Sequence, residues 1–84
     1  MTTITKNEHG VKVNGTQVFT GRIQDVRQIN EYKFEINTGW ATWEVYGGKK
    51  AGGAANEWFV ECKEQGEIYP ASGAKDAVDL LVSM

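Results

Sequence analysis

A strict alternation of apolar and polar residues between positions 32 and 45 constrains the fold of this chain more than any other feature. Residues 32–36 read YKFEI and residues 41–45 read ATWEV, with Thr38 and Gly39 between them. Successive side chains of a strand point to opposite faces. A hairpin closed at these two residues therefore places Phe34 opposite Trp43 on an apolar face, and Lys33 opposite Glu44 on a polar one. The pattern predicts an antiparallel sheet with one buried face.

A second hairpin is predicted near the N-terminus, where VKV and TQV flank Asn14 and Gly15. Asn-Gly tolerates the positive φ angles of a tight two-residue turn, which sets Val11 opposite Val18. Residues 21–28 continue in an extended conformation, and the broken spacing of Ile23 and Val26 predicts a bend or bulge between them.

A third hairpin follows in residues 57–68. The run EWFVECK places Trp58, Val60 and Cys62 on one face, and a loop over residues 64–66 with Gly66 in the left-handed conformation sets Cys62 opposite Ile68. Pro70 cannot donate a ladder hydrogen bond and closes this last strand.

The C-terminal segment has the spacing of an amphipathic helix over about residues 73–83. Ser72 is a suitable N-cap, and Ala74, Ala77, Val78 and Leu81 form one apolar stripe. Such a short helix needs a sheet to pack on. The sequence thus predicts an α+β fold, a twisted antiparallel meander of five or six strands packed by this helix. The alternative is a small half-open barrel of the SH3 or OB kind.

With 84 residues, the chain suits a single domain over 1–84, with a flexible N-terminus about 1–8 and a Gly-rich loop at 47–56. Cys62 is the one cysteine, so no intramolecular disulfide can form, and neither a leader pattern nor a long apolar run is present. We therefore expect a cytoplasmic protein without membrane contact.

Reactive groups are sparse, which argues against an enzyme. His9 and Cys62 are the one histidine and the one cysteine; we interpret His9 as exposed at the start of a strand and Cys62 as a small buried apolar residue. One Cys and one His fall short of a structural zinc site. We expect no catalytic residue, no metal and no cofactor.

The Gly-rich loop GGKKAGG is the one segment that suggests phosphate contact. Its Lys49 and Lys50 are followed by Ala51 and a strand, whereas a P-loop continues into a helix. We therefore interpret it as a loop without a nucleotide, and retain backbone contact to a nucleic acid as an alternative.

The strongest functional indication is a set of aromatic and acidic side chains that the predicted core does not bury. A single helix covers one sheet face, so some of Trp40, Tyr46 and Phe59 are expected on the uncovered side, and exposed aromatics serve as protein-interface anchors or base-stacking platforms. A patch of acidic residues suits a basic partner, although charge that only keeps the protein soluble is a simpler interpretation. For the aromatic residues, the simpler interpretation is that long neighbouring side chains cover them. The candidate acidic residues are Glu57, Glu61, Glu64 and Glu67.

These observations predict a small non-enzymatic protein-binding module, an inhibitor or adaptor of the kind found among accessory proteins of phages and mobile elements. The partner would be another protein, and self-association is an additional expectation because so small a core supplies limited stability. The alternative is a single-stranded nucleic-acid-binding protein, in which aromatics stack on bases and cations meet phosphates. Its candidate cations are Arg22, Arg27, Lys49 and Lys50. A net charge of −2 weakens this alternative, because backbone binding depends on cationic groups.

Overall fold

The computed structural model describes residues 2–48 and 57–84, and within them the chain forms two antiparallel sheets and one helix. The three-stranded sheet has the order β1-β2-β3 and the five-stranded sheet the order β4-β5-β6-β7-β8. The described elements are β1 (Ile4–Asn7), β2 (Gly10–Val13), β3 (Thr16–Thr20), β4 (Asp25–Asn30), β5 (Lys33–Asn37), β6 (Thr42–Gly47), β7 (Trp58–Cys62), β8 (Ile68–Ala71) and α1 (Ala74–Val82). The α+β class, the antiparallel meander and the C-terminal helix are confirmed, although the described residues form eight strands in two sheets and not the single sheet of five or six strands that we expected.

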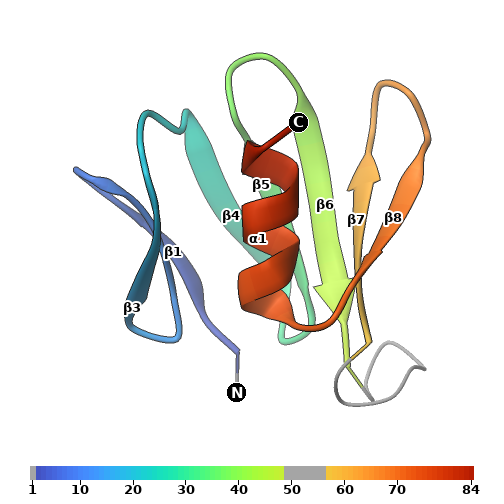
Figure 1. Ribbon diagram of the computed structural model, residues 1–84, viewed down its shortest axis with the longest axis horizontal. Coiled ribbons are helices and arrows are strands. Elements are labelled where there is room, and N and C mark those ends of the chain that lie inside the picture. The colour runs from blue at the N-terminus through green and yellow to red at the C-terminus, as the bar shows by residue number, and fades with distance from the viewer. Residues whose placement is uncertain (1, 49–56) are drawn as a thin grey trace.

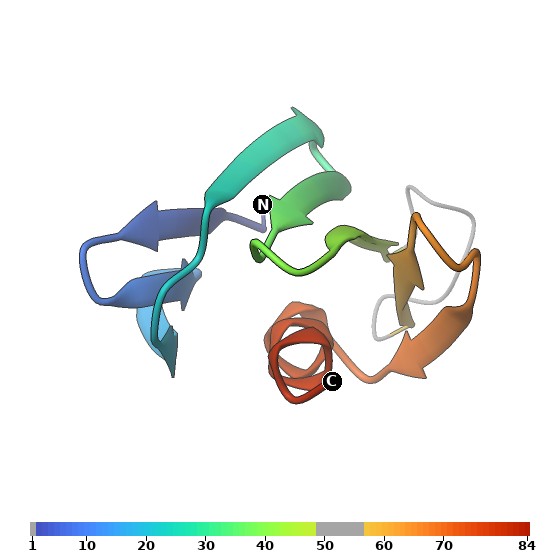
Figure 2. The same cartoon turned by 90° about the horizontal axis from the view of Figure 1, so that it is seen from above.

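The helix packs on one face of the five-stranded sheet, which curls around it, and the three-stranded sheet lies on the side of the helix away from β7 and β8 (Figure 1, Figure 2). The helix contacts β6, β7 and β8, and also β3 of the smaller sheet. The predicted apolar stripe of α1 faces this core, and Phe34 and Trp43 lie in it together. The largest fully buried side chains are Phe34, Ile36, Leu81, Val11, Val45, Val60 and Val78.

The division into two sheets occurs at residues 21–24, near the bend that the sequence predicts. There the chain leaves β3, buries the Ile23 side chain and enters β4. Backbone hydrogen bonds fix both ends of this link: Gly21 N–H donates to the His9 carbonyl (2.8 Å) and Gln24 N–H donates to the Asn37 carbonyl (2.9 Å). Ile23 thus becomes a core residue between the sheets.

The first hairpin turns at Asn14 and Gly15 as predicted, with φ angles of 52° and 83°. The predicted register is correct next to the turn but wrong further from it. Val11 lies opposite Phe19 and not Val18, because the register shifts between Val11 and Lys12 and leaves Val18 as an extra residue in β3.

The N-terminal segment, which we expected to be flexible over about residues 1–8, contains β1. Residues Ile4–Asn7 pair with β2, and Ile4 is buried opposite Val13. The strand start is held by Asn14, whose side-chain oxygen accepts a hydrogen bond from Thr3 N–H at 2.9 Å. A short hairpin with β2 thus orders a segment in which we predicted no strand.

The central hairpin keeps the predicted faces but shifts its register by two residues. Phe34 lies opposite Val45, and Ile36 lies opposite Trp43. The loop is longer than predicted because Thr38 N–H donates to the Ala41 carbonyl at 3.0 Å, which closes a four-residue connection. A shift of two leaves every side chain on its original face, so the buried set is unchanged.

The last hairpin is shifted by one residue relative to the prediction, and this shift changes a face. Gly66 has the predicted positive φ of 73°, yet Ile68 lies opposite Glu61 and not Cys62. Ile68 is consequently 54% exposed. Pro70 lies within β8 and does not end it, which an edge strand tolerates.

The helix begins one residue after its predicted start and ends at Val82. Gly73 occupies the N-cap position, while the hydroxyl of Ser72, the predicted cap, hydrogen-bonds the Asp76 carboxylate instead. Within residues 2–48 and 57–84, no helix has the length and apolar character needed to cross a membrane. Most of the predicted Gly-rich loop, including Lys49 and Lys50, lies outside the described residues.

Candidate functional site

The first candidate surface is the side of the five-stranded sheet that points away from α1, which we name the outer sheet face. The helix lies against the opposite side of this sheet (Figure 2). The strand registers and burial alternation place one set of side chains on this face. Its principal members are Arg27, Lys33, Glu35, Glu44, Tyr46, Phe59, Glu61, Ile68 and Pro70.

An apolar row crosses this face from β6 to β8 and contains Tyr46, Phe59 and Pro70. Tyr46 lies opposite Phe59, with ring centroids 5.7 Å apart and planes tilted by 32°, and Phe59 lies opposite Pro70. The Lys33 ammonium is 5.8 Å from the centroid of the Tyr46 ring. Tyr46 and Phe59 are each half-buried by these neighbours, so the row presents apolar edges to the outside. Ile68 extends this apolar surface.

A row of three carboxylates runs beside the aromatics. Glu35, Glu44 and Glu61 lie directly opposite one another on β5, β6 and β7. Like charges in this arrangement repel, and cations offset the repulsion at two of the three positions. Lys63 binds Glu35 at 3.0 Å, and Lys33 binds Glu44 at 3.2 Å.

Glu61 differs from the other two because its partner, among the described residues, is a neutral hydroxyl. The Tyr46 hydroxyl donates to Glu61 over a long 3.5 Å contact. Burial, followed by the Glu61 charge, raises the pKa of Tyr46 above its ordinary value, so this hydroxyl stays a neutral donor through the physiological range. The Glu61 charge is therefore not neutralised within the face.

The ion pair between Glu35 and Lys63 makes a testable contribution to acid stability. The hydrogen bond from Lys63 is the main cause that lowers the pKa of the Glu35 carboxyl, against an opposing effect of burial. A carboxyl with a lowered folded-state pKa stabilises the fold above its unfolded-state pKa, and this stabilisation is lost as pH falls through the folded-state value. We expect Lys63→Gln to raise the pKa of Glu35 towards its ordinary value and to make unfolding less pH-dependent in acid.

Carbon-13 NMR titration of the Glu35 carboxyl measures this directly. Arg27→Gln is a useful comparison, because Arg27 also binds Glu35, at 3.3 Å, but lowers its pKa less than Lys63 does. A Glu35 pKa that is the same in Lys63→Gln as in the unaltered protein would contradict the ion pair.

The other predicted acidic residues make contacts that differ from those of Glu61. Glu64 binds the backbone, since its carboxylate accepts Thr42 N–H at 3.0 and 3.1 Å. Hydrogen bonds from its own backbone amide and from Thr42 lower the pKa of Glu64. Glu67 accepts a hydrogen bond from the Tyr69 hydroxyl, and Glu57 is exposed immediately before β7. Glu64 thus acts as a structural clip between the loop after β7 and the start of β6.

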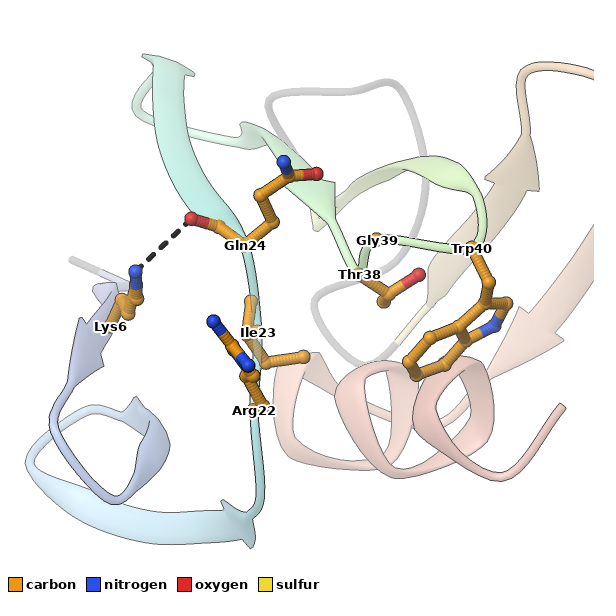
Figure 3. Close-up of a pocket in the computed structure, with 7 residues that line it drawn as sticks. All are labelled: Lys6, Arg22, Ile23, Gln24, Thr38, Gly39 and Trp40. Carbon is orange, nitrogen blue, oxygen red and sulfur yellow. Dashed lines mark hydrogen bonds between the residues drawn. The ribbon is translucent and has the colours of Figure 1, made fainter.

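The second candidate surface is a cleft of about 500 Å³ at the junction of the two sheets. Figure 3 shows Lys6 and Arg22 on one side of this cleft and Trp40 on the other, with Ile23 between them. Lys6 comes from β1, Arg22 from the link between the sheets and Trp40 from the loop after β5. The cleft is completed by Gln24, Thr38 and Gly39.

Trp40 is presented by a loop whose base is fixed by hydrogen bonds. The buried Thr38 hydroxyl donates to the Ala41 carbonyl at 3.0 Å and accepts Ala41 N–H at 3.2 Å. Gly39 N–H donates to the Asn37 side chain at 3.0 Å. Trp40 is 56% exposed, whereas Trp43 and Trp58 are 4% and 5% exposed. The loop therefore holds one indole in solvent on an ordered base.

The structure separates the aromatic candidates and brings other residues together. Trp40, which we expected on the same sheet face as Tyr46, lies in the cleft with Arg22. Arg27 instead belongs to the outer sheet face, where it pairs with Glu35. Sequence reasoning missed Lys6 altogether, because the packing of β1 against β4, which brings it to the cleft, leaves no local sequence signal.

His9 and Cys62 occupy the positions expected of them. The His9 ring is exposed and lies 3.5 Å from Glu8, while Cys62 is buried in the core. In the part of the chain that the structure describes, no three His, Cys, Asp or Glu side chains are grouped so that they could hold a metal ion.

Comparison with protein families, with curated proteins and with solved structures finds no match to this chain, so its function is inferred from these two surfaces.

Proposed function

We propose that this protein is a small non-enzymatic binding module that docks a partner protein on its outer sheet face and acts in the cytoplasm as an inhibitor or adaptor. The observation that carries the proposal is the apolar row of Tyr46, Phe59 and Pro70 on the sheet face opposite the helix, extended by the exposed Ile68. Large aromatic side chains held by neighbours are typical anchors of protein interfaces, because their burial costs little side-chain entropy.

The charges beside this row favour a basic partner. The Glu61 carboxylate lies next to Phe59 in β7 and has only the Tyr46 hydroxyl as a partner among the described residues. A Lys or Arg of a docking protein would supply the missing counter-charge while its neighbours cover the rings. Glu35 and Glu44 already hold cations and would contribute less.

Affinity capture from a host lysate tests the proposal with three variants. Phe59→Thr keeps a residue type that is common in strands but removes the ring, and Glu61→Lys reverses the charge that we assign to recognition. Asp79→Lys is the control, because it makes the same charge change at an exposed position of α1. We expect a captured protein that is lost with the first two variants and retained with the control.

Each variant is checked by circular dichroism for an unchanged fold before capture. Equal capture by all three variants would contradict docking on the outer sheet face. Sedimentation of the purified protein over a range of concentrations tests whether the partner is a second copy of this chain, in which case Phe59→Thr should shift the dimer towards monomer.

A further inference from the structure

We infer that the cleft between the two sheets, lined by Lys6, Arg22 and Trp40, is a second binding site, which takes a nucleotide unit through its phosphate and its base. The site lies apart from the outer sheet face and does not depend on the function proposed for that face. It combines two cationic side chains, an exposed indole and a concave shape, which come from three separate elements of the fold.

The charge of the cleft favours an anion. Neither Lys6 nor Arg22 forms an ion pair within residues 2–48 and 57–84, whereas Arg27, Lys33 and Lys63 are each bound to a glutamate. The described lining contains no acidic side chain. Two unneutralised cations on one side of a cleft create a local positive potential in a protein whose net charge is −2.

The donors of these cations are largely unused. Lys6 Nζ donates one hydrogen bond, to the Gln24 carbonyl at 3.1 Å, which leaves two of the three ammonium hydrogens for a ligand. The Arg22 guanidinium is exposed and can offer two parallel N–H groups to phosphate oxygens. The cationic side of the cleft therefore matches the chemistry of a phosphate group.

The opposite side of the cleft matches a planar ring. The Trp40 indole is more than half exposed, and the hydrogen bonds of Thr38 and Gly39 hold the base of its loop. Bases stack on such an exposed aromatic side chain, and this stacking strengthens binding of nucleic-acid bases of any sequence. A nucleotide carries a planar ring at one end and an anionic group at the other, so it matches a cleft with an aromatic side chain on one side and cations on the other. The cleft volume of about 500 Å³ lies in the range of small-ligand sites.

The test titrates the full chain with adenosine monophosphate, adenosine, inorganic phosphate, a short oligothymidine and an acidic tyrosine-containing peptide. Binding is followed by tryptophan fluorescence and by NMR shifts of the Trp40 indole N–H and the Gly39 amide. Because Trp43 and Trp58 are buried, quenching by a stacked base should come from Trp40 and disappear in Trp40→Leu.

Substitutions of charged residues test whether the phosphate binds at the cationic side of the cleft. Arg22→Glu is expected to weaken nucleotide binding by about tenfold or more, since charge-assisted contacts to phosphate are strong. Arg22→Gln, a milder change, should weaken it by a smaller factor. Lys75→Glu is the matched control: it makes the same change in net charge on α1, away from the cleft lining, and should leave affinity within about twofold.

The ligands separate the possible sources. Binding of both the mononucleotide and the oligonucleotide at Trp40 supports a site for free and strand-borne nucleotides, and binding of the oligonucleotide alone supports a site for a single strand. Phosphate binding as tight as that of adenosine monophosphate, tighter binding of the acidic peptide, equal affinity in Arg22→Glu and Lys75→Glu, or no binding at all would each overturn the inference.

Discussion

Replacement of Phe34 by alanine is expected to leave a large fraction of the protein, on the order of half, unfolded in buffer. Phe34 is the largest of the fully buried side chains, with 0% exposure, and it lies on β5, which is paired on both sides within the five-stranded sheet. Removing a buried phenylalanine costs about 3–5 kcal/mol, from lost transfer free energy and from the cavity left behind. A core of this size supplies roughly 3–5 kcal/mol of net stability, so the two quantities nearly cancel.

Urea denaturation followed by circular dichroism and by tryptophan emission measures this effect. The buried Trp43 and Trp58 should show red-shifted emission in Phe34→Ala even without urea. Ile29→Ala is the control, because Ile29 is 44% exposed on β4 and its loss should change the free energy of unfolding by about 0.5 kcal/mol or less. An unfolding midpoint in Phe34→Ala equal to that of Ile29→Ala would contradict the core.

The second large effect is expected at Gly10, the first residue of β2. Its φ of 151° is one that residues other than glycine rarely adopt. A Cβ there would overlap the Phe19 carbonyl oxygen, and would lie 2.9 Å from the Phe19 carbonyl carbon and 3.1 Å from Gly21 N. We expect Gly10→Ala to destabilise the protein by about 2–6 kcal/mol, the sum of backbone strain and overpacking.

Two other glycines separate these causes in the same denaturation experiment. Gly66 has a positive φ of 73° but open space where a Cβ would lie, and Gly73 has an extended φ and open space. We expect Gly66→Ala to lose about 1–3 kcal/mol through strain alone, and Gly73→Ala to lose little. Should Gly10→Ala prove no more costly than Gly66→Ala, the close approach of β2 to Phe19 would be wrong.

The alternation of apolar and polar residues is a reliable guide to which side chains are buried. It is a less reliable guide to which residues lie opposite one another in neighbouring strands. In β5 and β6 the shift of two residues keeps Phe34 and Trp43 on the inner face, because a strand repeats every two residues. The alternation of apolar and polar residues therefore fits both registers equally well and cannot distinguish them. In β7 and β8 the shift of one residue moves Ile68 outward, because a backbone hydrogen bond joins Cys62, and not Lys63, to Glu67 at the end of the loop.

The candidate surfaces were predictable to different degrees for the same reason. Tyr46 and Phe59 meet on one face because each alternates with buried neighbours, which is a local property of the sequence. The cleft joins Lys6, Arg22 and Trp40 through the packing of one sheet beside another. Nothing in the local pattern of β1 indicates that Lys6 approaches Gln24, so only tertiary structure shows this site.

The link at residues 21–24 has a consequence for how the cleft would respond to a ligand. Lys6 belongs to the smaller sheet and Trp40 to a loop of the larger one, and Arg22 lies in the connection between them. The width of the cleft is therefore set by the angle between the two sheets. A molecule that touches both walls restrains that angle, and by thermodynamic reciprocity anything else that holds the two sheets at the same angle would strengthen binding of the molecule.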